Sequence, residues 1–235
     1  MTAPRRFALI PAAGTGMRFG SDVPKQYTPL AGVPLLRQTI DALNDAIVLE
    51  AIFVVLAPQD RLYAEHIGRV RGVEPLYCGG MTRAETVRNG LAAIAGRIGA
   101  EDWVLVHDAV RPCVDVATLN RLLHELDAEP VGGLLAVPLA DTLKRAESGT
   151  GLRAMSTEAR EGLWCAQTPQ MFRYAILQHA FRRADLDKIT DEAQAVEALG
   201  VKPRLVQGSP SNIKVTYAED VALAEAILGQ RRKGA

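Results

Sequence analysis

Hydrophobic positions along the chain form short apolar runs that alternate with stretches of helical spacing. Leu36, Ile40 and Leu43 fall on one face of a helix, whereas Ala51–Ala57 is nearly all apolar, as in a strand buried on both sides. The apolar runs predict strands at Phe7–Pro11, Ala51–Ala57, Glu74–Cys78, Trp103–His107, Leu134–Val137 and Arg204–Val206. The helical patterns lie at about Leu35–Leu43, Arg83–Ile98, Val116–Leu126, Arg173–Ala184, Asp191–Leu199 and Glu219–Leu228. This alternation predicts an α/β fold, in which a parallel sheet is covered by helices on both faces.

One segment, Asp141–Arg160, departs from this alternation because it is rich in charges and glycine and poor in apolar residues. We expect it to form a hairpin that leaves the main sheet, with regular structure resuming at Gly162–Gln167. The chain is then a single domain, 1–235, with a β-arm at about residues 139–160. The basic tail Gly229–Ala235 is expected to be frayed.

Composition narrows the class of protein. Of the 235 residues, 48% are hydrophobic and 23% are charged, which is typical of a soluble globular chain. Lys+Arg and Asp+Glu both number 27, and this balance argues against a nucleic-acid partner. No apolar run reaches membrane-spanning length and no secretory signal is present, so we expect a cytoplasmic protein without a membrane partner. The widely spaced Cys78, Cys113 and Cys165 are expected to be free thiols.

A glycine-rich loop, Pro11–Lys25, follows the first predicted strand. Glycines allow backbone N–H groups to approach phosphate oxygens closely, which many nucleotide sites share. The loop is not a Walker A loop, because no lysine follows Gly20, and it is not a dinucleotide fingerprint, because its third glycine comes one residue late. The protein-kinase loop is also excluded, since that loop joins antiparallel strands.

Two cations, Arg18 and Lys25, distinguish this loop. Fixed cations stabilise the charge that builds up on phosphorus and on a departing pyrophosphate during reaction at an α-phosphate. The loop therefore predicts nucleotidyl transfer from a nucleoside triphosphate.

Further polar residues follow the other predicted strands, at the edge where open α/β sheets bind ligands. Gly79-Gly80 leads into a helix and is suited to hold a base and sugar, and Lys214 offers another cation. Asp108, which follows a buried strand, either holds Mg²⁺ against triphosphate oxygens or caps a turn. His107 beside it is expected to be packed rather than catalytic.

The sequence contains no hydrolase motif and no evident general base. A phosphate monoester is already ionised near neutral pH, because its second pKa is about 6, so it needs positioning rather than deprotonation. Such an acceptor suits a site built from arginine, lysine and Mg²⁺ better than a neutral hydroxyl does.

Taken together, PAAGTGMRFG…PKQY, GGMTRAETVRNGL, VHDAVRP, DTLKR, LWCAQTPQMF, TDEAQAVE and NIKVT resemble the 2-C-methyl-D-erythritol 4-phosphate cytidylyltransferase family over nearly the whole chain. The resemblance implies a Rossmann-like nucleotidyltransferase fold and a homodimer linked by the protruding arm. It also implies Mg²⁺-dependent transfer of the cytidylyl group of CTP to methylerythritol 4-phosphate, a polyol phosphate of the non-mevalonate isoprenoid pathway, with release of pyrophosphate.

The resemblance also implies roles for individual residues. Arg18 and Lys25 would stabilise the transition state, and Lys214 and Arg160 would position the substrate phosphate, Arg160 in the partner subunit's site. Asp108 would hold Mg²⁺, and the methylerythritol pocket would be lined by Arg111, Thr142 and Thr190. Contacts to CTP would come from Ala12, Ala13, Gly14, Thr15, Gly16, Gly80, Arg83, Thr86 and Ala109. Met81 stands where the family often has a polar residue.

Two other functions stay open. A ribitol 5-phosphate cytidylyltransferase shares the glycine loop, PKQ and VHDAVRP, although DTLKR and NIKVT favour methylerythritol phosphate by family likeness. A non-catalytic nucleotide-binding protein would not need cations around the α-phosphate, so the joint presence of Arg18, Lys25, Asp108 and Lys214 argues against it.

Overall fold

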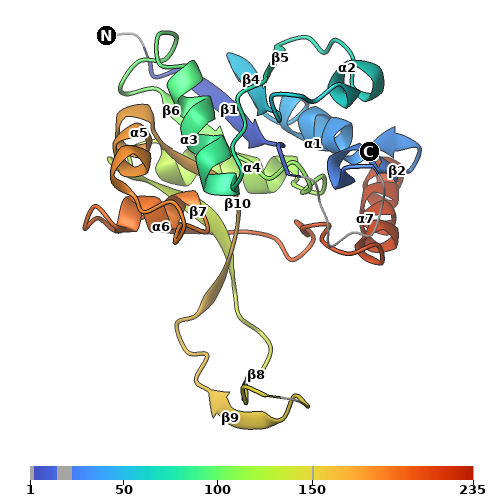
Figure 1. Cartoon of the computed structure of the whole chain (residues 1–235), viewed down its shortest axis with the longest axis vertical. Helices are drawn as coiled ribbons and strands as arrows, with labels where there is room; N and C mark the ends of the chain where they lie inside the picture. Colours follow the sequence, from blue (N-terminus) through green and yellow to red (C-terminus); the bar gives the residue numbers. More distant parts are fainter. Residues whose placement is uncertain (1–2, 15–22, 150, 235) are drawn as a thin grey trace.

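The computed structural model describes residues 3–14, 23–149 and 151–234 and contains a seven-stranded central sheet (Figure 1). From one edge to the other, the strands are β11 (Arg204–Gln207), β7 (Gly132–Pro138), β10 (Trp164–Arg173), β6 (Trp103–Val106), β1 (Arg6–Pro11), β4 (Ala51–Val55) and β5 (Val73–Leu76). All these strands run in one direction except β10, which pairs antiparallel with both β6 and β7. The sequence pattern predicted the parallel strands but not the reversed one.

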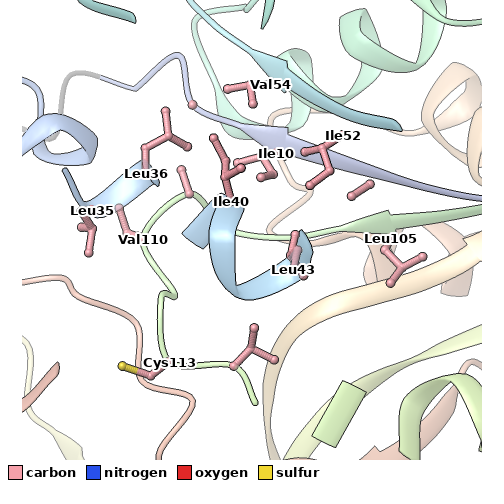
Figure 2. Close-up of a cluster of buried hydrophobic side chains, with 14 of the residues drawn as sticks. Ile10, Leu35, Leu36, Ile40, Leu43, Ile52, Val54, Leu105, Val110 and Cys113 are labelled. Carbon is pink, nitrogen blue, oxygen red and sulfur yellow. The ribbon is translucent and has the colours of Figure 1, made fainter. Parts of the chain in front are cut away.

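Side chains of the strands alternate between two buried clusters, one on each face of the sheet. Ala8 and Ile10 of β1 pack in the cluster that contains α1 (Leu35–Asn44), α4 (Val116–Leu126), α2 (Leu62–His66) and α7 (Asp220–Gly234). Phe7 and Leu9 pack in the opposite cluster with α3 (Arg83–Ala93), α5 (Tyr174–Arg183) and α6 (Glu192–Glu197). Figure 2 shows the first cluster, in which Ile40 of α1 lies against the sheet. The α/β fold with helices on both faces is therefore confirmed.

The reversed strand β10 begins at the edge where the parallel strands end. The chain leaves the sheet after Pro138 at the end of β7, makes the hairpin of β8 (Leu143–Ala146) and β9 (Ala154–Glu158), and returns as β10. This hairpin projects well away from the sheet and its helices (Figure 1). The β8–β9 hairpin lies within the segment Asp141–Arg160 and starts from the carboxyl edge of the sheet.

Some local features differ from the sequence predictions. Helix α3 ends at Ala93 rather than near Ile98, and in the turns that follow it the N–H groups of Ala95 and Arg97 donate to carbonyls three residues earlier. Helix α7 continues to Gly234 instead of fraying at Gly229, and Arg231 within it pairs with Asp115 at 3.3 Å. The short helix α2 and the small hairpin of β2 (Pro29–Leu30) and β3 (Val33–Pro34) were not predicted. Within the described residues, every helix is too short or too polar to cross a membrane.

Candidate active site

Two adjoining cavities lie at the carboxyl edge of the sheet. The first, of about 210 Å³, is lined by Pro11, Ala12, Ala13, Gly14, Lys25, Gln26, Gly80, Met81, Thr82, Arg83, Thr86, Asp108, Ala109, Val110 and Lys214. The second, of about 180 Å³, is lined by Arg83, Asp108, Arg111, Ala166, Gln167, Thr168, Gln170, Thr190, Asp191 and Lys214. Arg83, Asp108 and Lys214 line both cavities, so this charged cluster is their common wall.

Backbone packs closely around the first cavity. A Cβ at Gly79 would overlap Ala13 and the carbonyl of Leu56, and a Cβ at Gly80 would overlap Glu85. Glycine is therefore required at both positions for the segment after β5 to approach the segment after β1. The Gln26 side chain donates to the Ala12 carbonyl at 2.9 Å and holds the start of the glycine loop.

Helix α3 begins at the cavity with a capping box. The Thr82 hydroxyl accepts from the Glu85 N–H at 3.1 Å, and the Glu85 carboxylate accepts from the Thr82 N–H at 3.2 Å. One turn further, the Thr86 hydroxyl accepts from the Gly80 N–H at 3.1 Å. These bonds satisfy groups that the first turn of a helix leaves unpaired, and they place Arg83 at the wall between the cavities.

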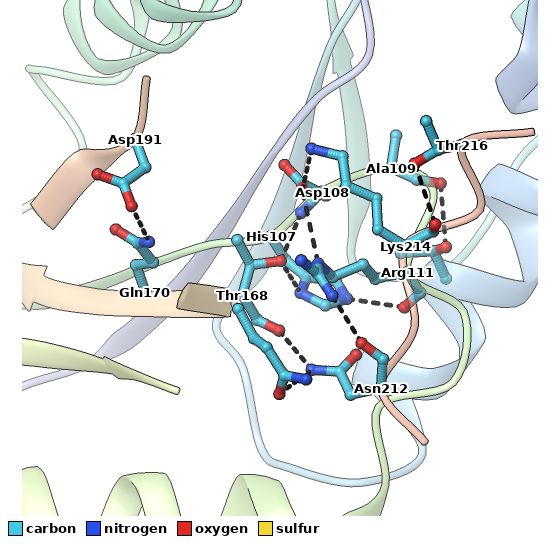
Figure 3. A network of polar contacts seen from close by, with 12 residues as sticks. His107, Asp108, Ala109, Arg111, Thr168, Gln170, Asp191, Asn212, Lys214 and Thr216 are labelled. Carbon is cyan, nitrogen blue, oxygen red and sulfur yellow. Dashed lines mark hydrogen bonds and ion pairs between the residues drawn. The ribbon is translucent and has the colours of Figure 1, made fainter. Parts of the chain in front are cut away.

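Three basic side chains surround the carboxylate of Asp108, which is 6% exposed. Figure 3 shows two of them, Lys214 and Arg111. The Arg83 Nε lies 3.0 Å from one carboxylate oxygen, and the Lys214 Nζ lies 2.9 Å from the other. The Arg111 Nε is 3.6 Å from that second oxygen. Although burial acts in the opposite direction, Arg83 and Lys214 hold the pKa of Asp108 well below its usual range. Asp108 is therefore a carboxylate at any physiological pH.

Lys214 reaches this cluster from a distant part of the chain. The N–H of Val215 donates to the carbonyl of Val110 at 2.9 Å, and the Arg111 side chain donates to the carbonyl of Asn212 at 2.6 Å. These two bonds hold the segment after β11 against the turn after β6. The turn thereby places Asp108 and Lys214 side by side.

A buried chain of hydrogen bonds supports the same turn (Figure 3). The Thr168 hydroxyl accepts from the Asp108 N–H at 3.0 Å and lies 3.0 Å from Nδ1 of His107. The Arg111 carbonyl can only accept, so Nε2 of His107 donates to it at 3.0 Å, and Nδ1 of the neutral ring accepts from the Thr168 hydroxyl. Burial lowers the pKa of His107 to about 4, which keeps the ring neutral. His107 is a packed supporting residue, as its position in the sequence predicts.

The structure brings together most of the residues predicted for the site. Ten line the first cavity, namely Ala12, Ala13, Gly14, Lys25, Gly80, Arg83, Thr86, Asp108, Ala109 and Lys214. Arg111 and Thr190 line the second cavity. Arg18, Thr15 and Gly16 lie outside the described residues.

The two predicted residues of the arm, Thr142 and Arg160, line neither cavity within the described chain. Thr142 is exposed, and the Arg160 side chain donates to the carbonyl of Ala140 at the base of the arm. Sequence reasoning missed Thr168, Asn212 and Glu192, although they occur in the motifs LWCAQTPQMF, NIKVT and TDEAQAVE. Their presence in those motifs was the sequence signal that could have indicated them. The motifs alone do not show their contacts, because each residue contacts a distant part of the chain.

Comparison with known proteins agrees with this geometry. The family model described as IspD, 2-C-methyl-D-erythritol 4-phosphate cytidylyltransferase, matches residues 7–230. The chain belongs to this family.

Relatives and solved structures of this cytidylyltransferase family align over nearly the full chain. A 2-C-methyl-D-erythritol 4-phosphate cytidylyltransferase of Dechloromonas aromatica is 51% identical and covers 97% of this chain and 100% of its own. A crystal structure of 4-diphosphocytidyl-2C-methyl-D-erythritol synthase superposes with a TM-score of 0.85 at 39% identity, over 97% of this chain and 100% of that one. A crystal structure of Francisella tularensis 2-C-methyl-D-erythritol 4-phosphate cytidylyltransferase superposes with a TM-score of 0.80 at 33% identity, over 95% of this chain and 99% of that one. The Rossmann-like nucleotidyltransferase fold implied by the resemblance is confirmed.

Proposed function

We propose that this chain transfers the cytidylyl group of CTP to 2-C-methyl-D-erythritol 4-phosphate and releases pyrophosphate. The observation that carries the proposal is the shared wall of Arg83, Asp108 and Lys214 between two cavities. A triphosphate in the first cavity and a phosphorylated acceptor in the second would meet at that wall. Membership in the cytidylyltransferase family supports methylerythritol phosphate as the acceptor rather than ribitol 5-phosphate.

The reaction needs charge and alignment more than proton transfer. An oxygen of the acceptor phosphate attacks the α-phosphorus of CTP, the bond between this phosphorus and the bridging oxygen breaks, and pyrophosphate leaves. Lys25 lines the first cavity and Lys214 lines both, so these cations are suited to neutralise the α-phosphate and the acceptor phosphate. Arg18 is proposed to join them from the glycine loop.

Magnesium fits the donor set of the first cavity. Asp108 is the acidic side chain among the described residues that line it, and its carboxylate is ionised. Mg²⁺ is commonly held by one or two carboxylates together with substrate phosphates and waters, which a single aspartate satisfies. Each carboxylate oxygen keeps a second acceptor site beside its bond to Arg83 or Lys214. When bound, Mg²⁺ would neutralise triphosphate charge, and Asp108 would hold it.

The remaining roles concern the assembly and its compartment. We propose a homodimer in which the arm carries Thr142 and Arg160 to the partner's site; the exposed Leu152 and Met155 on the arm are consistent with this proposal. Residues 1–235 are proposed to act as one nucleotidyltransferase domain. The three free cysteines fit the reducing cytoplasm, where we place the enzyme.

Pyrophosphate release from CTP and Mg²⁺, with each polyol phosphate offered in turn, tests the function. We expect turnover with methylerythritol 4-phosphate. Turnover with ribitol 5-phosphate alone would contradict the proposed acceptor, and the absence of turnover with either would favour a binding protein.

Lys25→Ala tests the catalytic assignment. We expect kcat to fall about 100-fold or more while the affinity for CTP changes little, because the cation acts on charge that develops in the transition state. Equal losses in kcat and in the CTP affinity measured by calorimetry would show that Lys25 contacts CTP already in the ground state and has no specific role in the transition state.

Mixing subunits tests the arm. If Arg160 acts across the dimer, inactive Arg160→Ala and Lys25→Ala subunits should regain partial activity when they are mixed. No recovery in a mixture shown to contain hybrid dimers would place Arg160 in the site of its own subunit.

A further inference from the structure

Glu192 is a fully buried carboxylate next to the site, with 0% of its surface exposed. Its two oxygens accept from the two terminal nitrogens of Arg83 at 2.7 and 3.1 Å, which makes a bidentate pair. The third edge group of the same guanidinium, Nε, donates to Asp108 at 3.0 Å. Arg83 is therefore held between two carboxylates, one on each side, and its direction is fixed.

The position of Glu192 is itself fixed by strand β10. The Gln170 side chain, 1% exposed, donates to the Asp191 carboxylate at 2.9 Å and accepts from the Ala193 N–H at 2.7 Å. These bonds hold the residues on both sides of Glu192. The Asp191 carboxylate also caps helix α6 through the Gln194 N–H at 2.9 Å. The carboxylate that meets Arg83 therefore comes from a segment with little freedom to move.

Electrostatics explains why a second carboxylate is needed. The Asp108 carboxylate is the counter-charge for Arg83 and Lys214, whose nitrogens lie 3.0 and 2.9 Å from its oxygens. The Nε of Arg111 lies 3.6 Å from the same carboxylate. Without Glu192, Arg83 would have to share that single carboxylate with two other cations. A buried cation without a full counter-charge is costly, and its side chain would move towards solvent or towards the phosphates.

We infer that Glu192 is a positioning residue for substrate binding, because it holds Arg83 as the common wall of the two cavities. The inference rests on the proposed function, in which CTP and the acceptor phosphate occupy those cavities. Arg83 contributes to both cavities, so its displacement affects both substrates. Glu192 touches neither substrate and acts only through Arg83.

Glu192→Gln tests this inference because it removes the charge and keeps the shape. We expect KM to rise about tenfold for CTP and for the acceptor, with kcat reduced about threefold or less, since binding of the ground state and of the transition state is weakened alike. Glu197→Gln is the matched control, because it removes the same charge from an exposed position of the same helix. All variants are assayed below their melting temperatures, where a merely structural role would leave both KM values unchanged.

Two results for Glu192→Gln would overturn the inference. One is KM values equal to those of Glu197→Gln, and the other is a loss in kcat with unchanged KM values. If wild-type protein turns over neither acceptor, the proposed function fails, and calorimetry of CTP binding then decides the inference: unchanged affinity in Glu192→Gln overturns it, and weaker affinity supports it.

A stability measurement covers the case in which Glu192→Gln does not fold well. Removing both charges in Glu192→Gln/Arg83→Gln should cost less stability than the two single variants lose together, because Glu192→Gln alone leaves Arg83 without one of its two counter-charges. A double variant whose loss in the free energy of unfolding equals the sum of the two single losses would show that the two side chains are not coupled.

Discussion

Two arginine–glutamate pairs in this protein have the same separation but opposite surroundings. Arg83 and Glu192 at the active site approach to 2.7 Å, with 26% and 0% of their side chains exposed. Arg145 and Glu158 join the two strands of the arm at 2.7 Å, with 58% and 35% exposed. Distance alone does not distinguish the two pairs.

Burial gives the pairs different consequences. Solvent competes for the exposed pair and screens it, so it contributes little and its loss is tolerated. In the active-site pair Glu192 has no contact with solvent and Arg83 has little, so solvent cannot fully replace a lost partner and removal of one charge is costly for the other. The ion pair of Arg83 and Glu192 therefore fixes side chains in the core of the site, whereas the ion pair of the arm contributes little to the arm's structure. Substitutions in the body of the protein and in the arm test this contrast.

Asp108→Asn should have the largest effect. It removes the carboxylate shared by Arg83, Lys214 and Arg111, and with it the proposed ligand for Mg²⁺. We expect kcat/KM to fall on the order of 100-fold or more and the free energy of unfolding to fall by about 3 kcal/mol. Pyrophosphate release and urea denaturation measure the two quantities. Retention of near wild-type activity would exclude Asp108 from the reaction.

Gly79→Ala should destabilise the rim of the first cavity. The new methyl group would overlap Ala13 and the Leu56 carbonyl, so the segments after β1 and β5 would have to separate. We expect a loss of about 2 kcal/mol in the free energy of unfolding, together with weaker CTP binding by calorimetry. Gly229→Ala is the control, because nothing lies within 4 Å of its Cβ and the helix should be slightly stabilised. Equal stability of the two variants would argue against close packing at Gly79.

Asp102→Asn should have an intermediate effect that depends on pH. Although partial burial acts in the opposite direction, hydrogen bonds from Arg5 lower the pKa of Asp102. A lowered folded-state pKa contributes stability that is present above the unfolded pKa of about 3.9 and is lost as pH falls through the folded value. We expect Asp102→Asn to cost about 1–2 kcal/mol at neutral pH and to flatten the fall in stability below pH ~4. Melting curves from pH 7 to pH 3 provide the measurement, and parallel curves for variant and wild type would contradict it.

Arg145→Ala should have the smallest effect. Its pair with Glu158 is exposed, so we expect the melting temperature to match that of the wild type within error. A large drop would mean that the arm pair is buried in the assembled protein, and it would then reveal a contact made by the arm with a partner subunit.

Local features were predictable from the sequence because neighbours along the chain decide them. The apolar run Ala51–Ala57 predicts a strand buried on both faces, and the structure confirms it, because Ile52 and Val54 lie in one cluster and Phe53 and Val55 in the other. Val116–Leu126 is a helix with the predicted bounds, and the charged, glycine-containing segment Asp141–Arg160 departs from the sheet as expected. Asp108 could be placed at the sheet edge because the ends of parallel strands meet there.

The tertiary structure decided which distant residues complete the site. Arg83 meets Glu192 across 109 positions of the chain, and Arg111 meets Asn212 across 101. The reversal of β10 brings Gln170 and Thr168 to the site, although nothing in the local pattern of that segment indicates its direction. A sequence pattern records how each residue fits its neighbours along the chain. The partner of a buried charge is chosen by which elements the sheet brings together, because only a side chain within hydrogen-bonding distance can replace the water that burial removes.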